Sequence, residues 1–123
     1  MLKHKFILAE GILVLEPDAP LEAADFEGLA REIDPYIAKY GTLPGLMIHA
    51  SAFPGWANIQ AFRAHMRLIE THLQKLQKLA VVTDSSFLAE LPKFAAHLVQ
   101  TELKHFPESA YDDALRWLGW RPR

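Results

Sequence analysis

Three serines, an aspartate and two histidines provide the side chains that a small hydrolase would need. Ser51 follows His49 after one apolar run, Asp84, Ser85 and Ser86 follow another, and His105 lies further along the chain. A serine hydroxyl beside a histidine base and an orienting carboxylate can perform nucleophilic catalysis. However, no Gly-x-Ser-x-Gly sequence occurs, and serine or aspartate directly after a strand is more often a helix cap. A small serine hydrolase is therefore kept as an alternative, and we assign no catalytic residue.

Histidine is frequent enough to raise the question of a metal site. The six histidines are His4, His49, His65, His72, His97 and His105. No His-x3-His pair occurs, and the helical pair His65 and His72 is separated by roughly 10 Å of rise, too far for both to bind one ion. The chain also lacks a phosphate-binding loop and a dinucleotide fingerprint. We therefore expect no metal and no cofactor.

A loop after the third apolar run carries two large aromatic side chains. Phe53 and Trp56 lie beside the turn residues Pro54 and Gly55. Such rings add apolar surface where a strand end usually meets solvent, so they could bind a ligand or a partner. Alternatively, Trp56 folds back over the end of the sheet as a lid on the core. Both interpretations stay open from the sequence.

The composition is typical of an ordinary globular domain. Of 123 residues, 50% are hydrophobic, 23% are charged, and 13 Lys and Arg against 15 Asp and Glu give a net charge of −2. We expect one domain over residues 1–123, without the basic excess that nucleic-acid binding needs. No run approaches the ~18 apolar residues of a membrane span, and Phe6–Ala9 is too short for a signal-peptide core. With no cysteine either, the protein is expected to be cytoplasmic and not an integral membrane protein.

Apolar runs bounded by turn residues predict the strands. The first two runs suit an antiparallel hairpin with the two-residue turn Glu10-Gly11. The third run is continuously apolar, as expected of a central strand covered on both faces. The predicted strands are His4–Ala9, Ile12–Leu15, Gly45–Ala50, Leu79–Thr83 and Glu102–Phe106.

Helical patterns follow all but the first strand. Pro35 lies inside the first pattern and predicts a kink or a break. The apolar residues of this pattern, spaced by three and four, are Phe26, Leu29, Ile33, Ile37 and Tyr40. Another helix is predicted at Phe87–Thr101, and a terminal helix is predicted with Ser109 or Asp112 as its cap. The order ββαβαβαβα indicates an α/β domain, with a mixed sheet of four to five strands flanked by helices.

The helix predicted over residues 57–78 has a long apolar stripe. Its residues are Ile59, Phe62, Met66, Ile69, Leu73 and Leu76, spaced alternately by three and four. The same spacing fits a short coiled-coil seam, but packing on the sheet is the preferred interpretation. Because the stripe has more apolar positions than one sheet face needs, we also expect a homodimer that uses a face of this helix and the Trp56 loop.

Four segments together carry a resemblance to a known family. They are LEAADFEGLAREIDPYI, GLMIHASAFPGW, KLAVVTDS and the closing ELKHFP…ALRWL. The chain resembles the SpoIIAA-like branch of the STAS/SEC14-type superfamily, which implies a STAS-like sheet and a non-enzymatic role in regulation or ligand binding. Sigma-regulatory members are switched by phosphorylation of a serine at the helix start, where this chain has Trp56-Ala57-Asn58. His49 stands where these families often carry aspartate.

The expected function is therefore a binding or regulatory module, resembling anti-sigma-factor-antagonist-like STAS domains, with a protein partner or a small apolar ligand. Ligands of α/β domains collect at the carboxyl ends of parallel strands. An alternative is SEC14-like peripheral lipid binding, for which the 57–78 helix offers Arg63, Arg67, Lys75 and Lys78. The predicted binding residues are His49, Ser51, Phe53, Trp56, Thr83, Asp84 and Ser85.

Overall fold

The computed structural model describes residues 2–52, 54–85 and 101–122. Its centre is one five-stranded sheet in which each strand lies beside the next one along the chain. Strand β1 is antiparallel to β2, and all other neighbours are parallel. The strands are β1 (Leu2–Ile7), β2 (Ile12–Pro17), β3 (Leu43–His49), β4 (Leu76–Val82) and β5 (Glu102–Phe106). The predicted α/β fold with a mixed sheet is confirmed.

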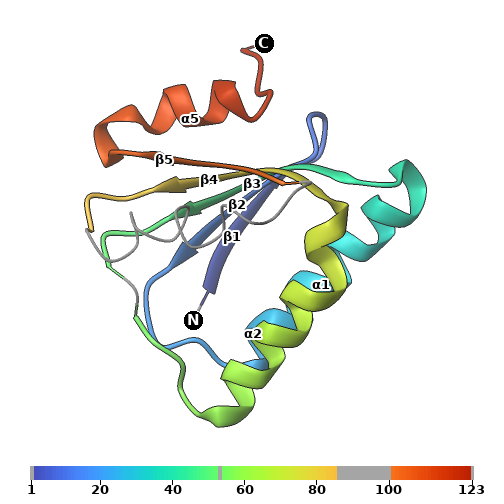
Figure 1. The fold of residues 1–123 in the computed structure, drawn as a ribbon, viewed down its shortest axis with the longest axis vertical. Helices are drawn as coiled ribbons and strands as arrows, with labels where there is room; N and C mark the ends of the chain where they lie inside the picture. Colours follow the sequence, from blue (N-terminus) through green and yellow to red (C-terminus); the bar gives the residue numbers. More distant parts are fainter. Residues whose placement is uncertain (1, 53, 86–100, 123) are drawn as a thin grey trace.

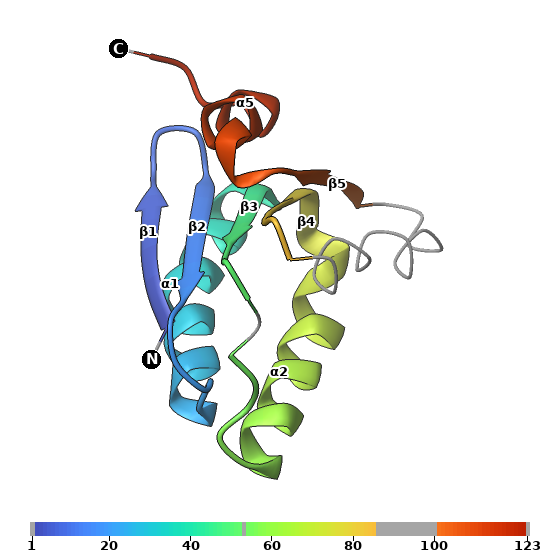
Figure 2. The same cartoon turned by 90° about the vertical axis from the view of Figure 1, so that its left-hand side faces the viewer.

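Helices cover both faces of the sheet (Figures 1 and 2). Helices α1 (Ala23–Tyr40) and α2 (Ile59–His72) lie on one face, and α5 (Tyr111–Trp117) lies on the other. Two short 3-10 helices, η1 (Leu73–Lys75) and η2 (Glu108–Ala110), lead into β4 and α5. The helix predicted at Phe87–Thr101 falls almost entirely on residues 86–100, outside the described part.

Alternating side chains of β2 divide the core into two layers. Ile12 and Val14 face α5, and Leu13 faces α1, all three being almost fully buried. Met47 of β3 is fully buried on the α5 side. This alternation is what a strand covered on both faces produces.

The β1–β2 hairpin has a longer loop than predicted. Ile7 pairs with Ile12, so the connection is Leu8–Gly11, four residues instead of two. Gly11 has a φ of +69° and its N–H donates to the carbonyl of Ile7 at 2.9 Å. Glycine at this position supplies the left-handed conformation that closes the longer loop.

Helix α1 runs through Pro35 as one continuous helix, so of the predicted kink or break the break is absent. A proline costs the helix one backbone hydrogen bond and some steric strain. The residues around it offset this cost, because Ile33 is buried and the ring of Tyr36 packs 5.4 Å from that of Phe6. At the other end, the Asp25 carboxylate accepts the Glu22 N–H at 2.8 Å as part of a capping box.

Helix α2 is shorter than predicted, and the face that it packs against the core is not the predicted one. It begins after Asn58, whose side chain accepts the Ala61 N–H at 2.9 Å, and ends at His72. The first part of the predicted apolar stripe does not pack on the sheet, since Ile59, Phe62 and Ile69 are 55%, 37% and 38% exposed. The last two residues of the stripe, Leu73 and Leu76, do lie in the core cluster on this face. The inward residues of α2 are instead Ala61, Ala64 and Leu68. Small alanines allow α2 to approach its neighbours closely, which a search for large apolar residues does not detect.

Among the described residues, no helix has both the length and the apolar character to cross a bilayer.

Candidate functional site

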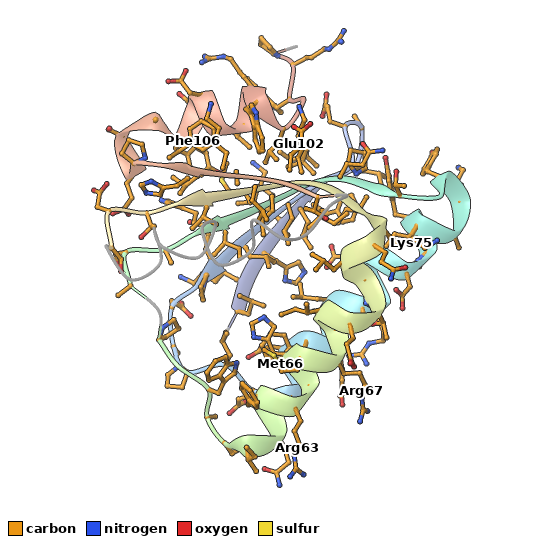
Figure 3. All side chains as sticks on the ribbon, viewed as in Figure 1. Arg63, Met66, Arg67, Lys75, Glu102 and Phe106 are labelled. Atoms are coloured by element: carbon orange, nitrogen blue, oxygen red, sulfur yellow. The ribbon has the colours of Figure 1, made fainter. Side chains whose placement is uncertain are left out.

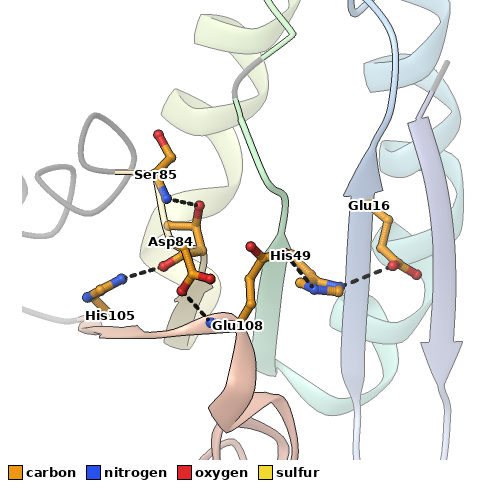
Figure 4. Close-up of polar contacts among 7 residues, drawn as sticks. Glu16, His49, Asp84, Ser85, His105 and Glu108 are labelled. Carbon is orange, nitrogen blue, oxygen red and sulfur yellow. Dashed lines mark hydrogen bonds and ion pairs between the residues drawn. The ribbon is translucent and has the colours of Figure 1, made fainter.

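His49, the last residue of β3, lies between two carboxylates at the carboxyl ends of the strands (Figure 4). Its Nδ1 is 3.1 Å from Oε2 of Glu16 on β2, and its Nε2 is 3.7 Å from Oε1 of Glu108 in η2. The ring of Tyr111 lies 4.9 Å from the imidazole at a 60° tilt. We call Glu16, His49, Glu108 and Tyr111 the strand-end cluster.

Strand pairing explains why these residues meet. Strands β2 and β3 are parallel, and Leu15 pairs with Ile48, so the next residues, Glu16 and His49, follow side by side. Both belong to the side-chain series that faces α5, where η2 and the start of α5 bring Glu108 and Tyr111. The two carboxylates contact opposite nitrogens of one ring, so their oxygens do not converge on a point where an ion could bind. No group of three metal ligands is present in the described ranges.

Tyr111 keeps its proton in this setting. Burial raises the pKa of its hydroxyl, and the negative charges of Glu16 and Asp112 raise it further. The hydroxyl is therefore a hydrogen-bond donor at neutral and moderately alkaline pH. The cluster thus offers a donor and two carboxylate acceptors on one partly exposed edge.

The predicted site residues after β4 take part in hydrogen bonds that connect the end of β4 to β5. Thr83 is fully buried, its hydroxyl oxygen accepts the Ser85 N–H at 3.0 Å, and its own N–H donates to Phe106 at 2.9 Å. The carbonyl of Thr83 accepts a hydrogen bond from His105 Nε2 at 2.8 Å. Thr83 therefore has a structural position within the turn.

Asp84 connects this turn to the strand-end cluster. Its Oδ1 accepts the backbone N–H of Glu108 at 3.0 Å, and the Glu108 side chain reaches His49. The structure thus brings His49, Thr83, Asp84 and Ser85 to one edge, as predicted from their places after two parallel strands.

The serine hydrolase arrangement is not assembled in the described residues. The ring of His49 pairs with carboxylates, and that of His105 with a backbone carbonyl. Neither ring is hydrogen-bonded to Ser51, which is exposed, or to Ser85. Neither His49 nor His105 is therefore placed to activate Ser51 or Ser85 as a nucleophile.

Trp56 lies at the end of the loop that leaves β3, where its ring contacts α2. Its indole N–H donates to Nδ1 of His65 at 3.1 Å, and its ring meets Phe62 edge-on at 4.9 Å. The loop is held by Leu21, whose N–H donates to the Gly55 carbonyl and whose carbonyl accepts the Ala57 N–H. Trp56 is 36% exposed, so it is anchored on one side and open on the other. Phe53 lies outside the described residues.

His65 gives this region a testable pH dependence. Burial lowers the pKa of its imidazole from 6.5, and the neutral ring can accept the Trp56 N–H while stacking on Phe26 at 4.5 Å. Because the unfolded chain binds the proton more readily than the folded one, the free energy of unfolding should fall as the pH drops below 6.5.

The variant His65→Gln keeps an acceptor for Trp56 but cannot titrate. Urea unfolding across the acidic range should therefore show a shallower loss of stability for the variant than for the native chain. All other histidines are common to both proteins, so the difference between the two curves isolates His65. Equal slopes would contradict the assignment.

A shallow groove of about 440 Å³ lies on another part of the molecule, between β1 and α1. Its lining includes the aromatic residues Phe6, Tyr36 and Tyr40. It is not continuous with the strand-end cluster, since none of the residues around His49 lines it.

Fold and site together define a class: an α/β domain with one antiparallel edge strand, parallel βα units and a polar cluster at the strand ends. A family model described as SpoIIAA-like matches residues 12–119, and the chain belongs to this family. Among solved structures, the chain is similar to an uncharacterized protein of the DUF3478 family with a SpoIIAA-like fold from Shewanella loihica PV-4. That likeness has a TM-score of 0.72 at 18% identity and covers 96% of this chain and 92% of the other. No curated protein matches the chain significantly.

Proposed function

We propose that this protein is a non-catalytic binding module that recognises a protein partner at the strand-end cluster. The observation that carries the proposal is the placement of a partly exposed His49 between Glu16 and Glu108, at the edge where α/β domains bind their ligands. Membership of the SpoIIAA-like family supports a regulatory or binding role at the level of the family. A small apolar ligand is the alternative occupant.

The charge of the cluster favours a cationic group on the partner. Glu16 is half-exposed, and Asp84 and Asp112 are exposed on the same edge. Each carboxylate suits a Lys or Arg side chain, which forms charge-assisted hydrogen bonds with it. Tyr111 would add a neutral donor to the same contact.

Site-specific photocrosslinking in the native host tests this proposal. A photoreactive residue at Ser51, two residues beyond His49, should capture a partner protein, whereas one at Leu8, at the opposite end of the sheet, should not. The double variant Glu16→Gln, Glu108→Gln should abolish the capture from Ser51, and Asp113→Asn is the matched control. Capture that is unchanged in the double variant, or labelling of Ser51 or Ser85 by a serine-directed covalent probe, would overturn the proposal.

Peripheral lipid binding is a second candidate because α2 exposes apolar side chains beside Arg63 and Arg67. The basic face is smaller than predicted, however. Lys78 belongs to β4, where its ammonium donates to the Trp117 carbonyl at 3.0 Å and lies over the Trp117 ring on the α5 side. Co-sedimentation with anionic vesicles at low salt, where weak electrostatic attachment is strongest, distinguishes this function.

A further inference from the structure

Helix α2 has an apolar stripe that the described part of the chain leaves largely uncovered. Ile59, Phe62, Met66 and Ile69 follow a three-four-three spacing, and three of the four are exposed. These are the a and d positions of two heptads, the spacing that pairs one helix with another. The inward residues Ala61, Ala64 and Leu68 lie on a different face of the helix, so the stripe is not needed for packing on α1.

Trp56 lengthens the apolar surface at the start of the helix. Its ring lies edge-on against Phe62, 4.9 Å away, and it is fixed in place by its hydrogen bond to His65. An aromatic side chain that is already ordered loses little entropy on binding, which is why such residues dominate association energies. The surface is therefore pre-organised at one end.

The charges beside the stripe select the orientation of a partner helix. Arg63 and Glu70 are seven residues apart, so both occupy heptad position e on the same flank, and both are exposed. Neither has an ion-pair partner among the described residues. Figure 3 shows Arg63, Met66 and Arg67 along this helix.

We propose that α2 pairs antiparallel with α2 of a second copy of this chain, about a two-fold axis near Met66. In an antiparallel pair, the e positions of the two helices run alongside each other in opposite order. Arg63 then meets Glu70 of the second copy, and the two-fold axis repeats this ion pair. In a parallel pair of helices, Arg63 of one copy would not meet Glu70 of the other. The inference does not depend on the strand-end partner, because it uses the opposite face of the sheet.

Charge reversal in the full chain tests the ion pairs. Sedimentation equilibrium over micromolar concentrations should show the mass rising from 13.9 kDa towards twice that value. Arg63→Glu or Glu70→Arg alone should weaken association by about tenfold or more, and the double swap should restore it. Arg67→Glu, away from the paired flank, is the matched control. Failure of the double swap to restore association would overturn the orientation.

A single introduced cysteine locates the axis, because the chain has none of its own. Under mild oxidation Met66→Cys should form a covalent dimer, and Ile59→Cys should not, since the antiparallel arrangement separates the two copies of position 59. Equal cross-linking of both variants indicates a parallel pair and overturns the proposal. A mass that stays at 13.9 kDa at every concentration also overturns it.

Discussion

Replacing Gly11 with alanine is expected to lower the free energy of unfolding by about 2–4 kcal/mol. The residue has a φ of +69°, which a side chain with a Cβ adopts only at a cost. A Cβ at this position would also lie 2.4 Å from the hydroxyl oxygen of Tyr36 and 2.7 Å from Cδ of Pro44. The hairpin loop, α1 and the entry to β3 meet here, so at least one of them must shift to admit the methyl group.

Gly41→Ala provides a matched control for this prediction. Its φ of +88° carries a similar backbone cost, but nothing lies within 4 Å of the position of its Cβ. Urea unfolding of both variants therefore separates conformational strain from steric crowding, and Gly41→Ala should lose only about 1 kcal/mol. Equal losses in the two variants would show that the close approach at Gly11 relaxes without cost.

The variant Met47→Ala is expected to lose about 2–5 kcal/mol of stability. Met47 lies at the middle of the central strand, is fully inaccessible, and packs in the cluster between the sheet and α5. Its removal leaves a cavity that neighbours from β2 and β4 cannot readily fill, since they are fixed by strand pairing. Calorimetric or urea unfolding measures the loss.

Leu8→Ala is the control for the core, because Leu8 is 69% exposed in the hairpin loop. It should change stability by no more than about 0.5 kcal/mol. If Met47→Ala behaved like Leu8→Ala, the α5 side of the sheet would not be the tightly packed layer described above.

The buried face of an element was predictable where its large apolar residues are also the residues that are buried. The helical spacing of Phe26, Leu29 and Ile33 predicted the inward face of α1, and all three are buried. The same reasoning was wrong for α2, because burial there depends on small alanines and the large side chains point elsewhere. The end of that helix was also predicted too late, since Leu76 continues the apolar spacing but starts β4.

The site was predictable only in part, because the contacts of the strand-end cluster join residues far apart in the sequence. His49 and Asp84 were found from their places after apolar strands. Glu16 was missed because β2 was predicted to end at Leu15, and the parallel pairing of β2 with β3 is not visible in a hairpin pattern. Glu108 follows Pro107 after the last strand, and an acidic residue just beyond a strand is the signal that could have identified it.

The order of the strands has a consequence for how the chain acquires its structure. Each strand lies beside its predecessor in the sequence, from β1 at one edge to β5 at the other. During synthesis from the N-terminus, the strand with which each new strand pairs has therefore already been synthesised. No later segment has to be inserted between two earlier strands. The entropy cost of each pairing step is the cost of closing the one segment that connects the two strands. This cost grows only slowly with the length of the segment. We expect the sheet to assemble by successive addition, with β1 to β3 as the template on which β4 and β5 are laid down.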